Sequence, residues 1–244
     1  MITNLKKLRD SWKRNRKIQR ETPEVWLLND LNVAYIQIPK VATRSIQQCL
    51  ANYYADCEGV AKPLSWNKEW IKSVEKKTAF HATRKELHIL SANVFVFAFV
   101  RNPYARLYSA YKNKILQPLD SGEKNIFWNH GMTLGMEFGE FVDIVCTIPD
   151  EKIDRHLRSQ SWFLTYEGSV IPEFIGHLES FDEDWSELNK LFNLGKPDHK
   201  NSTVSLNTEN HLEGYDSELE NKVFKRYQAD FEFFNYERLY VNSR

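Results

Sequence analysis

The sequence predicts a three-layer α/β domain with a central, largely parallel sheet flanked by helices. Short apolar runs rich in β-branched and aromatic residues alternate with segments whose apolar residues have helical spacing, an order typical of parallel sheets. One run, Asn93–Val100 (NVFVFAFV), is apolar almost without interruption. That pattern predicts a strand buried on both faces, with helices above and below it. A chain of 244 residues is long enough for such a domain.

The N-terminal segment, residues 1–30, is expected to be a basic helical lead-in to a single domain over residues 31–244. A short apolar run, Val25–Leu28, lies near the end of this lead-in. The lead-in is interpreted either as a solvated helix or as a contact for an anionic membrane surface or polyanion. Its basic residues are Lys6, Lys7, Arg9, Lys13, Arg14, Arg16, Lys17 and Arg20.

The first strand–helix unit follows directly. Val33–Ile38 has the composition of a strand, and Ser45–Tyr54 spaces its apolar residues for one face of a helix. After the strand at Asn93–Val100, Asn102 and Pro103 form an N-cap followed by proline at the first helical position. Further elements are expected at about 136–146 (helix), 171–178 (strand), 182–194 (helix) and 215–234 (helix).

Composition limits the classes of function. Lys+Arg and Asp+Glu both number 33, so no net field favours nucleic acid as a partner. Three cysteines, Cys49, Cys57 and Cys146, are too few for a disulfide framework, and reduced thiols are favoured over a Cys49–Cys57 pair. We find no signal-peptide pattern and no run of 18 apolar residues. The expectation is a soluble cytoplasmic protein whose oligomeric state the sequence leaves open.

The stretch Tyr35–Ser45 (YIQIPKVATRS) has the layout of a phosphate-binding loop. A turn between a buried strand and a helix N-terminus directs several backbone N–H groups to one place. Lys40 adds a positive charge, Thr43 and Ser45 add hydroxyl groups, and Arg44 can bind oxyanions with its guanidinium. The stretch therefore predicts an anion cradle, with an ordinary strand–helix turn as the alternative.

The same loop departs from nucleoside-triphosphate sites. The G-x-x-x-x-G-K-[ST] pattern is absent, and Val41 and Ala42 stand where glycine would be expected. A second loop, Arg101–Tyr111 (RNPYARLYSAY), follows the apolar strand and offers Arg101 and Ser109. Ligands of open α/β sheets gather at the carboxyl ends of strands. Two oxyanion sites there would suit a nucleotide with two separate phosphate groups.

These two motifs resemble the nucleotide signatures of the membrane-type (Golgi-type) carbohydrate sulfotransferases, sulfotransferase family 2, which use 3′-phosphoadenosine 5′-phosphosulfate (PAPS). The resemblance extends in order through most of the chain from Tyr35 to Glu237, and it implies a P-loop-like domain. Its further motifs are DRHLRSQ (154–160), FIGHLESFDEDWSEL (174–188), HKNSTVS (199–205) and FEFFNYE (231–237).

The resemblance implies roles for the nucleotide-binding residues. Lys40 would bridge the leaving phosphate and the sulfuryl group, and Arg101 and Ser109 would bind the 3′-phosphate. The remaining loop residues would hold the 5′-phosphosulfate, and two later ones would lie near the nucleotide. The former are Val41, Ala42, Thr43, Arg44 and Ser45, and the latter are Asn201 and Ser202.

An acceptor hydroxyl also needs a base. His81 is the first candidate, because some related sulfotransferases place a histidine in the same region; His156 is the second and Glu179 the third. Arg158 is expected to bind the nucleotide or an acidic substrate, and Gln160 is expected to contact the substrate. No His/Cys cluster has zinc-ligand spacing, and the chemistry requires no metal.

The sequence departs from the family pattern in several places. Arg44 replaces a small or hydroxyl residue, Leu157 replaces the common aromatic residue, and Ser159 stands where proline is usual. No segment of this sequence is expected to correspond to the transmembrane anchor of the animal members. The chain is therefore interpreted as a soluble, bacterial type of relative or as the catalytic portion of a larger protein.

The predicted function is transfer of a sulfuryl group from PAPS to a hydroxyl of a polysaccharide or glycolipid. Two alternatives stay open. One is a kinase-like phosphotransferase, which would bind ATP with Mg²⁺. The other is a non-catalytic module that binds anionic glycans through the basic N-terminus.

Overall fold

The computed structural model describes residues 22–117, 126–197 and 214–239. Their chain separates into two compact units. The sheet unit contains residues up to Val100 together with the segment from Phe163 to about residue 197. The helical unit contains Arg101–Trp162 and the C-terminal segment from residue 214. A single domain over residues 31–244 stays a prediction from the sequence.

The sheet unit is built on five strands in the order β3-β1-β2-β4-β7. β2 pairs in parallel with β4, and β4 pairs in parallel with β7. β1 is antiparallel to both β2 and β3, so it alone runs against the direction of the other strands. The strands are β1 (Glu24–Leu28), β2 (Val33–Gln37), β3 (Ala79–His81), β4 (Phe95–Val100) and β7 (Phe174–His177).

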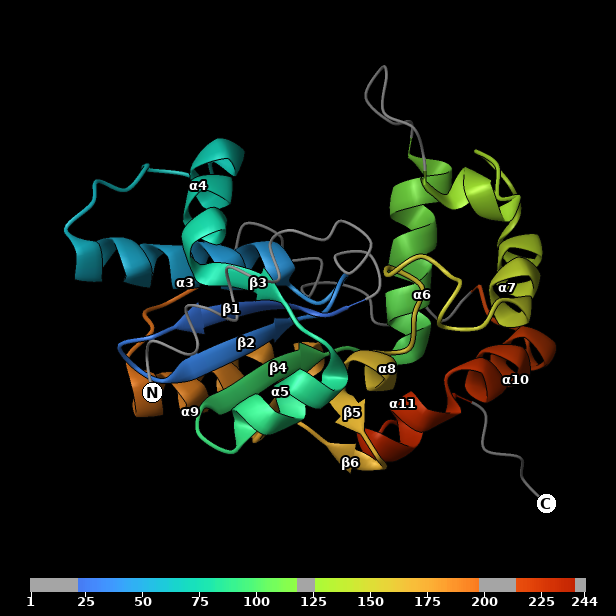
Figure 1. Ribbon diagram of the computed structural model, residues 1–244. Coiled ribbons are helices and arrows are strands. Elements are labelled where there is room, and N and C mark those ends of the chain that lie inside the picture. Colours follow the sequence, from blue (N-terminus) through green and yellow to red (C-terminus); the bar gives the residue numbers. More distant parts are fainter. Residues whose placement is uncertain (1–21, 118–125, 198–213, 240–244) are drawn as a thin grey trace. The chain divides into compact units, whose positions relative to one another are not determined.

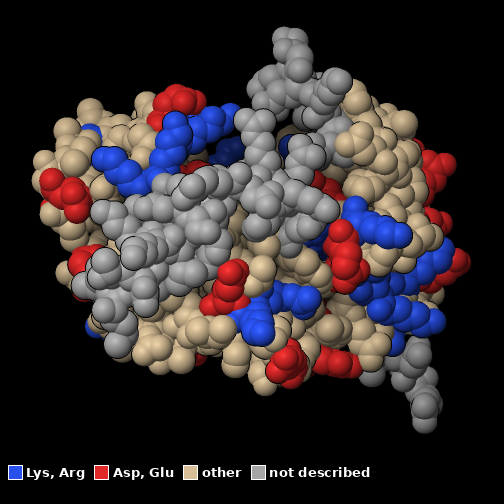
Figure 2. Space-filling model, viewed as in Figure 1, with Lys and Arg blue, Asp and Glu red and all other residues tan. Residues whose placement is uncertain are grey.

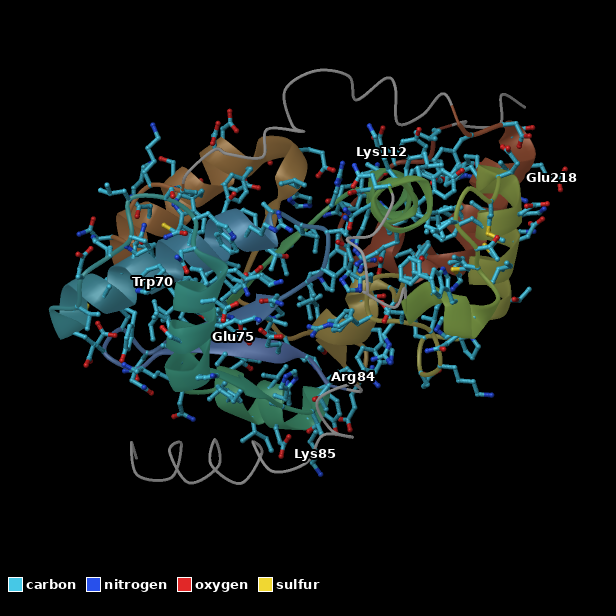
Figure 3. The ribbon with its side chains drawn as sticks, turned by 90° about the horizontal axis from the view of Figure 1, so that it is seen from above. Trp70, Glu75, Arg84, Lys85, Lys112 and Glu218 are labelled. Carbon is cyan, nitrogen blue, oxygen red and sulfur yellow. The ribbon has the colours of Figure 1, made fainter. Side chains whose placement is uncertain are left out.

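Helices cover both faces of this sheet. Figure 1 shows α3 and α4 on one face and α5 and α9 on the other, as expected for three layers. The helices are α3 (Thr43–Glu58), α4 (Lys68–Thr78), α5 (Arg84–Ser91) and α9 (Phe181–Phe192). In Figure 3, Trp70 and Glu75 mark α4, and Arg84 and Lys85 mark the start of α5. A two-stranded hairpin, β5 (Thr165–Tyr166) and β6 (Ser169–Val170), and the 3-10 turn η3 (Leu178–Ser180) complete the unit.

β4 lies in the middle of the hydrophobic core. Its residues from Val96 to Val100 are all buried, which confirms the prediction of a strand covered on both faces. The Phe99 ring packs 5.0 Å from the Phe181 ring and 6.0 Å from the Trp185 ring, between centroids. Apolar side chains from α9 therefore fix one helix layer against the central strand.

β1 is a difference from the sequence analysis. Residues 24–28 were assigned to the basic helical lead-in, but they form a fully buried strand between β2 and β3. Val25 and Trp26 have no exposed surface. A five-residue apolar run does not distinguish strand from helix by periodicity, so its pairing with two other strands decides its conformation. The basic residues 6–20 lie outside the described residues.

The helical unit contains α6 (Pro103–Tyr111), the π turn η1 (Lys112–Leu116), the 3-10 turn η2 (Ile126–His130), α7 (Phe138–Thr147), the start of α8 (Gln160–Leu164), α10 (Ser217–Arg226) and α11 (Gln228–Phe233). Figure 3 labels Lys112 at the end of α6 and Glu218 in the first turn of α10. Asn102 caps α6, because its side-chain oxygen accepts from the N–H groups of Tyr104 and Ala105. This confirms the predicted Asn-Pro helix start.

The core of the helical unit is rich in aromatic residues. Side chains of α6 and η1 contribute to it, since Leu107, Tyr111 and Ile115 are buried and Tyr108 packs against this core. The closing helix, predicted as one element over 215–234, is broken at Tyr227. Tyr227 has a non-helical backbone conformation (φ −114°, ψ 22°), and its hydroxyl donates to the Leu157 carbonyl at 2.7 Å.

Charge and cysteine placement agree with the composition. Figure 2 shows basic and acidic side chains interspersed over the visible face. Cys49, Cys57 and Cys146 are free thiols, as favoured from the sequence. Among the described residues, no helix combines the length and the apolar composition that crossing a bilayer requires.

Candidate active site

The carboxyl ends of four strands lie at one edge of the sheet, because β2, β3, β4 and β7 run in the same direction. Strand ends at this edge are where open α/β sheets bind ligands. Each of these strands leads into a candidate residue or loop. β3 ends at His81, β2 leads into the loop from Ile38 to Ser45, β4 ends one residue before Arg101, and β7 ends at His177.

The backbone of the loop after β2 has an unusual conformation. Lys40 has φ 71° and Ala42 has φ 43° and ψ 24°, so two non-glycine residues occupy the left-handed region. This region costs an L-residue about 1–2 kcal/mol relative to the right-handed helix. The sequence analysis expected glycine at Ala42, and the structure shows why: the turn into α3 needs a positive φ there.

Side chains of the loop have different surroundings. Val41 is fully buried, whereas Arg44 is exposed. Thr43 donates its hydroxyl proton to the Ile38 carbonyl at 2.9 Å, which closes the loop across the turn. Ser45 is half-buried, and its backbone N–H donates to the Ala42 carbonyl. Of the two predicted hydroxyl donors, Thr43 is thus already engaged with the backbone.

The N-terminus of α3 fits an anion. Its N-cap residue, Ala42, has no side chain that can accept from the first-turn N–H groups. Helix N-termini carry unsatisfied N–H groups and a partial positive charge, and a bound oxyanion satisfies both. Lys40 adds a full positive charge two residues earlier.

Polar residues form a row at the same edge of the sheet. Glu24 is paired in register with Gln37 on one side and with His81 on the other. Gln37 in turn accepts a hydrogen bond from the Gln47 side chain of α3 at 2.8 Å. Residues directly opposite on neighbouring strands share a face, so Glu24, Gln37 and His81 line one side of the sheet. The register thus brings His81 to the end of the sheet where the β2 loop begins.

Arg101 and Gln160 are brought together in the helical unit. The Arg101 N–H donates to Gln160 Oε1 at 2.9 Å, and Gln160 Nε2 donates to the Arg101 carbonyl at 2.8 Å. Gln160 is completely buried. Its amide therefore contacts protein backbone, although the sequence analysis assigned it to the substrate. Ser109 lies half-buried on α6.

His156 forms a pair with Asp154. The His156 Nδ1 atom lies 2.7 Å from Asp154 Oδ1, and the same oxygen accepts the His156 backbone N–H at 2.9 Å. Burial lowers the pKa of His156 and outweighs the opposing effect of the Asp154 carboxylate. The pKa of Asp154 is lowered in turn, because the contacts with His156 outweigh its burial. When the Nδ1–H group donates to Asp154, the other ring nitrogen, Nε2, carries no proton and can accept one. This tautomer suits a general base.

Hydrogen bonds within the protein also stabilise the rest of the segment from Asp154 to Gln160. Arg158 is buried; its Nε donates to the Ile153 carbonyl at 3.1 Å, and its guanidinium lies 4.5 Å from the Trp162 ring centroid. Arg106 donates to the Arg158 carbonyl at 2.6 Å. Leu157, which replaces an aromatic residue of the family motif, is fully buried in the core.

Three further predicted residues complete the set. Glu179 is exposed in the turn after β7. Asn201 and Ser202 lie outside the described residues. His177 lies at the carboxyl end of β7. Its backbone N–H donates to Asp184 Oδ2 at 2.6 Å.

Comparison with known proteins identifies the family. A family model described as the sulfotransferase family matches residues 23–237, which is most of the chain. The chain belongs to the sulfotransferase family. This confirms the family that the sequence predicted. The match begins one residue before β1, so that strand is an integral part of the family domain.

A curated relative of this sulfotransferase-family chain is carbohydrate sulfotransferase 12 of Mus musculus. It is 26% identical over 166 residues, covering 57% of this chain and 39% of the relative. The chain thus matches about two fifths of the length of that protein. No solved structure matches the chain. Within the described ranges, no group of three or more His, Cys, Asp or Glu residues is placed to hold a metal ion.

Proposed function

We propose that the protein transfers a sulfuryl group from PAPS to a hydroxyl of a carbohydrate, either a polysaccharide or a glycolipid. The observation that carries the proposal is the loop between β2 and α3 in a sulfotransferase-family chain. It combines Lys40, an uncapped helix N-terminus and a left-handed turn without glycine. These features suit a tetrahedral anion, and the missing glycine–lysine–serine order disfavours a nucleoside triphosphate.

In the proposed reaction the acceptor oxygen attacks the sulfur in line with the bond to the 5′-phosphate. The new S–O bond forms as the bond between sulfur and the phosphate oxygen breaks, and the phosphate leaves with the electron pair. The Lys40 ammonium and the first N–H groups of α3 stabilise the negative charge that develops on that phosphate. The chain thus contributes positioning and charge stabilisation, as in phosphoryl transfer.

The nucleotide is proposed to be recognised by its two ends. The residues from Lys40 to Ser45 bind the 5′-phosphosulfate, and Arg101 and Ser109 bind the 3′-phosphate. Asn201 and Ser202 approach the nucleotide. Because a guanidinium forms paired hydrogen bonds with phosphate oxygens, Arg101 is the residue that distinguishes PAPS from nucleotides without a 3′-phosphate.

A base must accept the proton of the acceptor hydroxyl. We retain His81 as the first candidate, since the strand register brings it to the end of the sheet where the β2 loop begins. His156 is the second candidate and has the better-defined orientation, through Asp154. Glu179 is the third. A pH–activity profile of single variants of these residues distinguishes the three, because only loss of the base removes the acidic limb of kcat/KM.

On the acceptor side, Arg158 and Gln160 are proposed to act by fixing neighbouring main chain, since Arg158 donates to the Ile153 carbonyl and Gln160 donates to the Arg101 carbonyl. The donor chemistry needs no metal. Two further points stay predictions from the sequence. One is a contact of the basic N-terminus with membrane or with an anionic acceptor, and the other is a cytoplasmic location.

The direct test is a transfer assay with labelled PAPS and a panel of polysaccharides, glycosaminoglycans and glycolipids. We expect labelled product with at least one carbohydrate class. Lys40→Ala should lower kcat by about 10²–10³-fold, as for removal of one oxyanion donor. Lys40→Arg serves as a charge-conserving comparison. Absence of transfer to every acceptor, with retained glycan binding, would favour the non-catalytic module.

Nucleotide selectivity separates the remaining alternative. Adenosine 3′,5′-bisphosphate (PAP) should raise the melting temperature more than ADP does, and Arg101→Ala should abolish that difference. A kinase-like enzyme would instead be stabilised by ATP in the presence of Mg²⁺. Equal stabilisation by PAP and ADP would exclude the 3′-phosphate site.

A further inference from the structure

Gln160 makes an unusual contact with the main chain of Arg101. Its side-chain amide accepts from the Arg101 N–H at 2.9 Å and donates to the Arg101 carbonyl at 2.8 Å. These are the two hydrogen bonds that a neighbouring strand would supply to a residue in a sheet. The amide takes the place of that strand at the residue that follows β4.

Asp230 fixes the main chain from which this amide projects, and its Oδ2 lies 3.5 Å from Gln160 Nε2. The Asp230 carboxylate accepts the backbone N–H of Gln160 at 2.8 Å and that of Ser161 at 2.7 Å. It thereby caps the start of α8, where Gln160 is the first residue. Gln160 and Asp230 have no exposed surface, and the pKa of Asp230 is raised by burial.

This arrangement restricts Arg101 strongly. Both polar groups of its main chain are bonded to one rigid, buried amide, so the residue cannot rotate about its own backbone without breaking two buried hydrogen bonds. Breaking buried hydrogen bonds costs more than losing exposed ones, because the freed groups have no water to bind. The Cα–Cβ direction of Arg101 is therefore set by Gln160.

We propose that Gln160 is a positioning residue for nucleotide selectivity, which fixes the backbone of Arg101 so that its guanidinium meets the 3′-phosphate. The inference rests on the proposed function, in which Arg101 binds that phosphate. Because Gln160 is completely buried, the proposal gives it no direct contact with the nucleotide or the reacting atoms. Its contribution is to the orientation of a paired guanidinium–phosphate contact, which small displacements weaken strongly.

The test compares two variants that remove hydrogen bonds from the same buried segment. Gln160→Met preserves the approximate volume and removes both bonds to Arg101. Tyr227→Phe removes the bond from the Tyr227 hydroxyl to the Leu157 carbonyl, which involves no atom of Arg101. Dissociation constants for PAP and for ADP are measured by calorimetry on the full chain, with Arg101→Ala as the reference for loss of the guanidinium.

We expect wild type and Tyr227→Phe to share the same preference for PAP over ADP, although the variant melts at a lower temperature. In Gln160→Met the preference should fall by about tenfold or more, toward that of Arg101→Ala, which corresponds to about 1.4 kcal/mol. The ADP constant should change little. A merely structural role would lower stability in both variants and leave the ratio of constants unchanged.

The measured preference for PAP tests the positioning role of Gln160 and the 3′-phosphate assignment of Arg101 separately. If wild type prefers PAP and Gln160→Met retains that preference, the positioning role is overturned and the proposed function stands. If wild type does not prefer PAP, the 3′-phosphate assignment of Arg101 is wrong, and the role of Gln160 falls with it.

A measurement on the unmodified chain covers the case in which Gln160→Met does not fold. Amide hydrogen exchange of Arg101 in the nucleotide-free protein should be slow, because its N–H is bonded to a buried acceptor. Exchange of the Arg101 amide at the rate of an exposed loop residue would contradict the arrangement directly.

Discussion

Asp154 holds the imidazole of His156 through a single oxygen. Its Oδ1 accepts the His156 backbone N–H at 2.9 Å and lies 2.7 Å from the ring Nδ1. Both side chains are largely shielded from solvent. Burial lowers the pKa of the His156 ring, and this effect is larger than the opposite effect of the neighbouring Asp154 carboxylate. The neutral imidazole is therefore the form that the folded protein prefers.

This preference makes stability depend on pH. In the unfolded chain His156 binds a proton near pH 6.5, but in the folded protein it does so only at lower pH. Between these two values the unfolded state binds more protons, so the free energy of unfolding falls as the pH falls. The contribution of this group is at most about 1.4 kcal/mol per pH unit.

The measurement is urea denaturation at intervals from pH 7.5 to pH 5 for wild type and His156→Gln. The variant should lose less stability over the acidic half of this range, because glutamine does not titrate. Asp154→Asn removes the effect that raises the pKa of His156 and should extend the wild-type slope to lower pH. Parallel curves for wild type and His156→Gln would show that the histidine does not titrate in the way described.

Ala42 occupies a backbone conformation that glycine adopts more easily. Its φ of 43° lies in the left-handed region, so Ala42→Gly relieves strain in the folded state. Glycine also increases the entropy of the unfolded chain, which offsets part of this gain. We expect the variant to raise the free energy of unfolding by about 0.5–1 kcal/mol in urea denaturation.

Ala51→Gly is the matched control for that substitution. Ala51 is buried in the interior of α3, where glycine should lower the free energy of unfolding by about 1 kcal/mol or more. The two Ala→Gly variants should therefore shift stability in opposite directions. A loss of similar size in both would mean that the turn at Ala42 carries no strain.

Gly176 leaves the space that the Phe99 ring occupies. A Cβ atom at this position would lie 2.3 Å from Phe99 Cε1, well inside van der Waals contact. Phe99 is packed against Phe181 and Trp185, so it has little freedom to move away. Gly176→Ala should lower the free energy of unfolding by about 1–3 kcal/mol through overpacking.

Gly139→Ala provides the comparison for Gly176→Ala. At Gly139, on α7, an added Cβ would meet nothing closer than 3.9 Å, and helix propensity favours alanine. That variant should be neutral or more stable than wild type by about 0.4–1 kcal/mol in thermal or urea denaturation. Equal behaviour of the two glycine variants would contradict the close packing of Phe99 against β7.

Tyr104 donates its hydroxyl to a buried carboxylate. The acceptor, Glu220 Oε1, lies 2.5 Å away, and Arg238 also binds this carboxylate. Burial alone would raise the pKa of Glu220, but the hydrogen bonds from Arg238 and Tyr104 outweigh it and hold the pKa below its usual range. Because the acceptor is ionised, Tyr104→Phe should cost about 1.5–3 kcal/mol of unfolding free energy.

A second tyrosine offers a neutral counterpart. Tyr111 donates to the Met136 carbonyl at 2.8 Å, so Tyr111→Phe should cost only about 1 kcal/mol. The cost of Tyr104→Phe should also shrink as the pH falls through the lowered pKa of Glu220, since protonation removes the charge from the acceptor. A cost that is the same for both variants, and constant with pH, would argue against an ionised Glu220.

Local signals in the sequence were sufficient for several elements. The apolar run at Asn93–Val100 predicted β4, and Asn102 with Pro103 predicted the start of α6. The strand and the helix that flank the Lys40 loop were predicted from consecutive residues within Val33–Tyr54. In each case the information lies within a few consecutive residues.

Elements stabilised by distant partners were not predicted. β1 was placed in the lead-in, β3 has only three residues, and the last helix was not divided at Tyr227. β1 and β3 pair with each other, although they are remote in sequence. At Tyr227 the helix is interrupted, and the Tyr227 hydroxyl contacts the Leu157 carbonyl, 70 residues away.

The sequence by itself determined the family and the residue types at the proposed nucleotide site, because a lysine, an arginine and a strand–helix turn carry their chemistry wherever they lie. Only the tertiary structure decided what Gln160 and Arg158 touch, because their partners are set by folding. Gln160 bonds to Arg101, 59 residues away, rather than facing outward. A buried polar side chain must find its hydrogen-bond partners inside the protein, and only the folded chain brings those partners within reach.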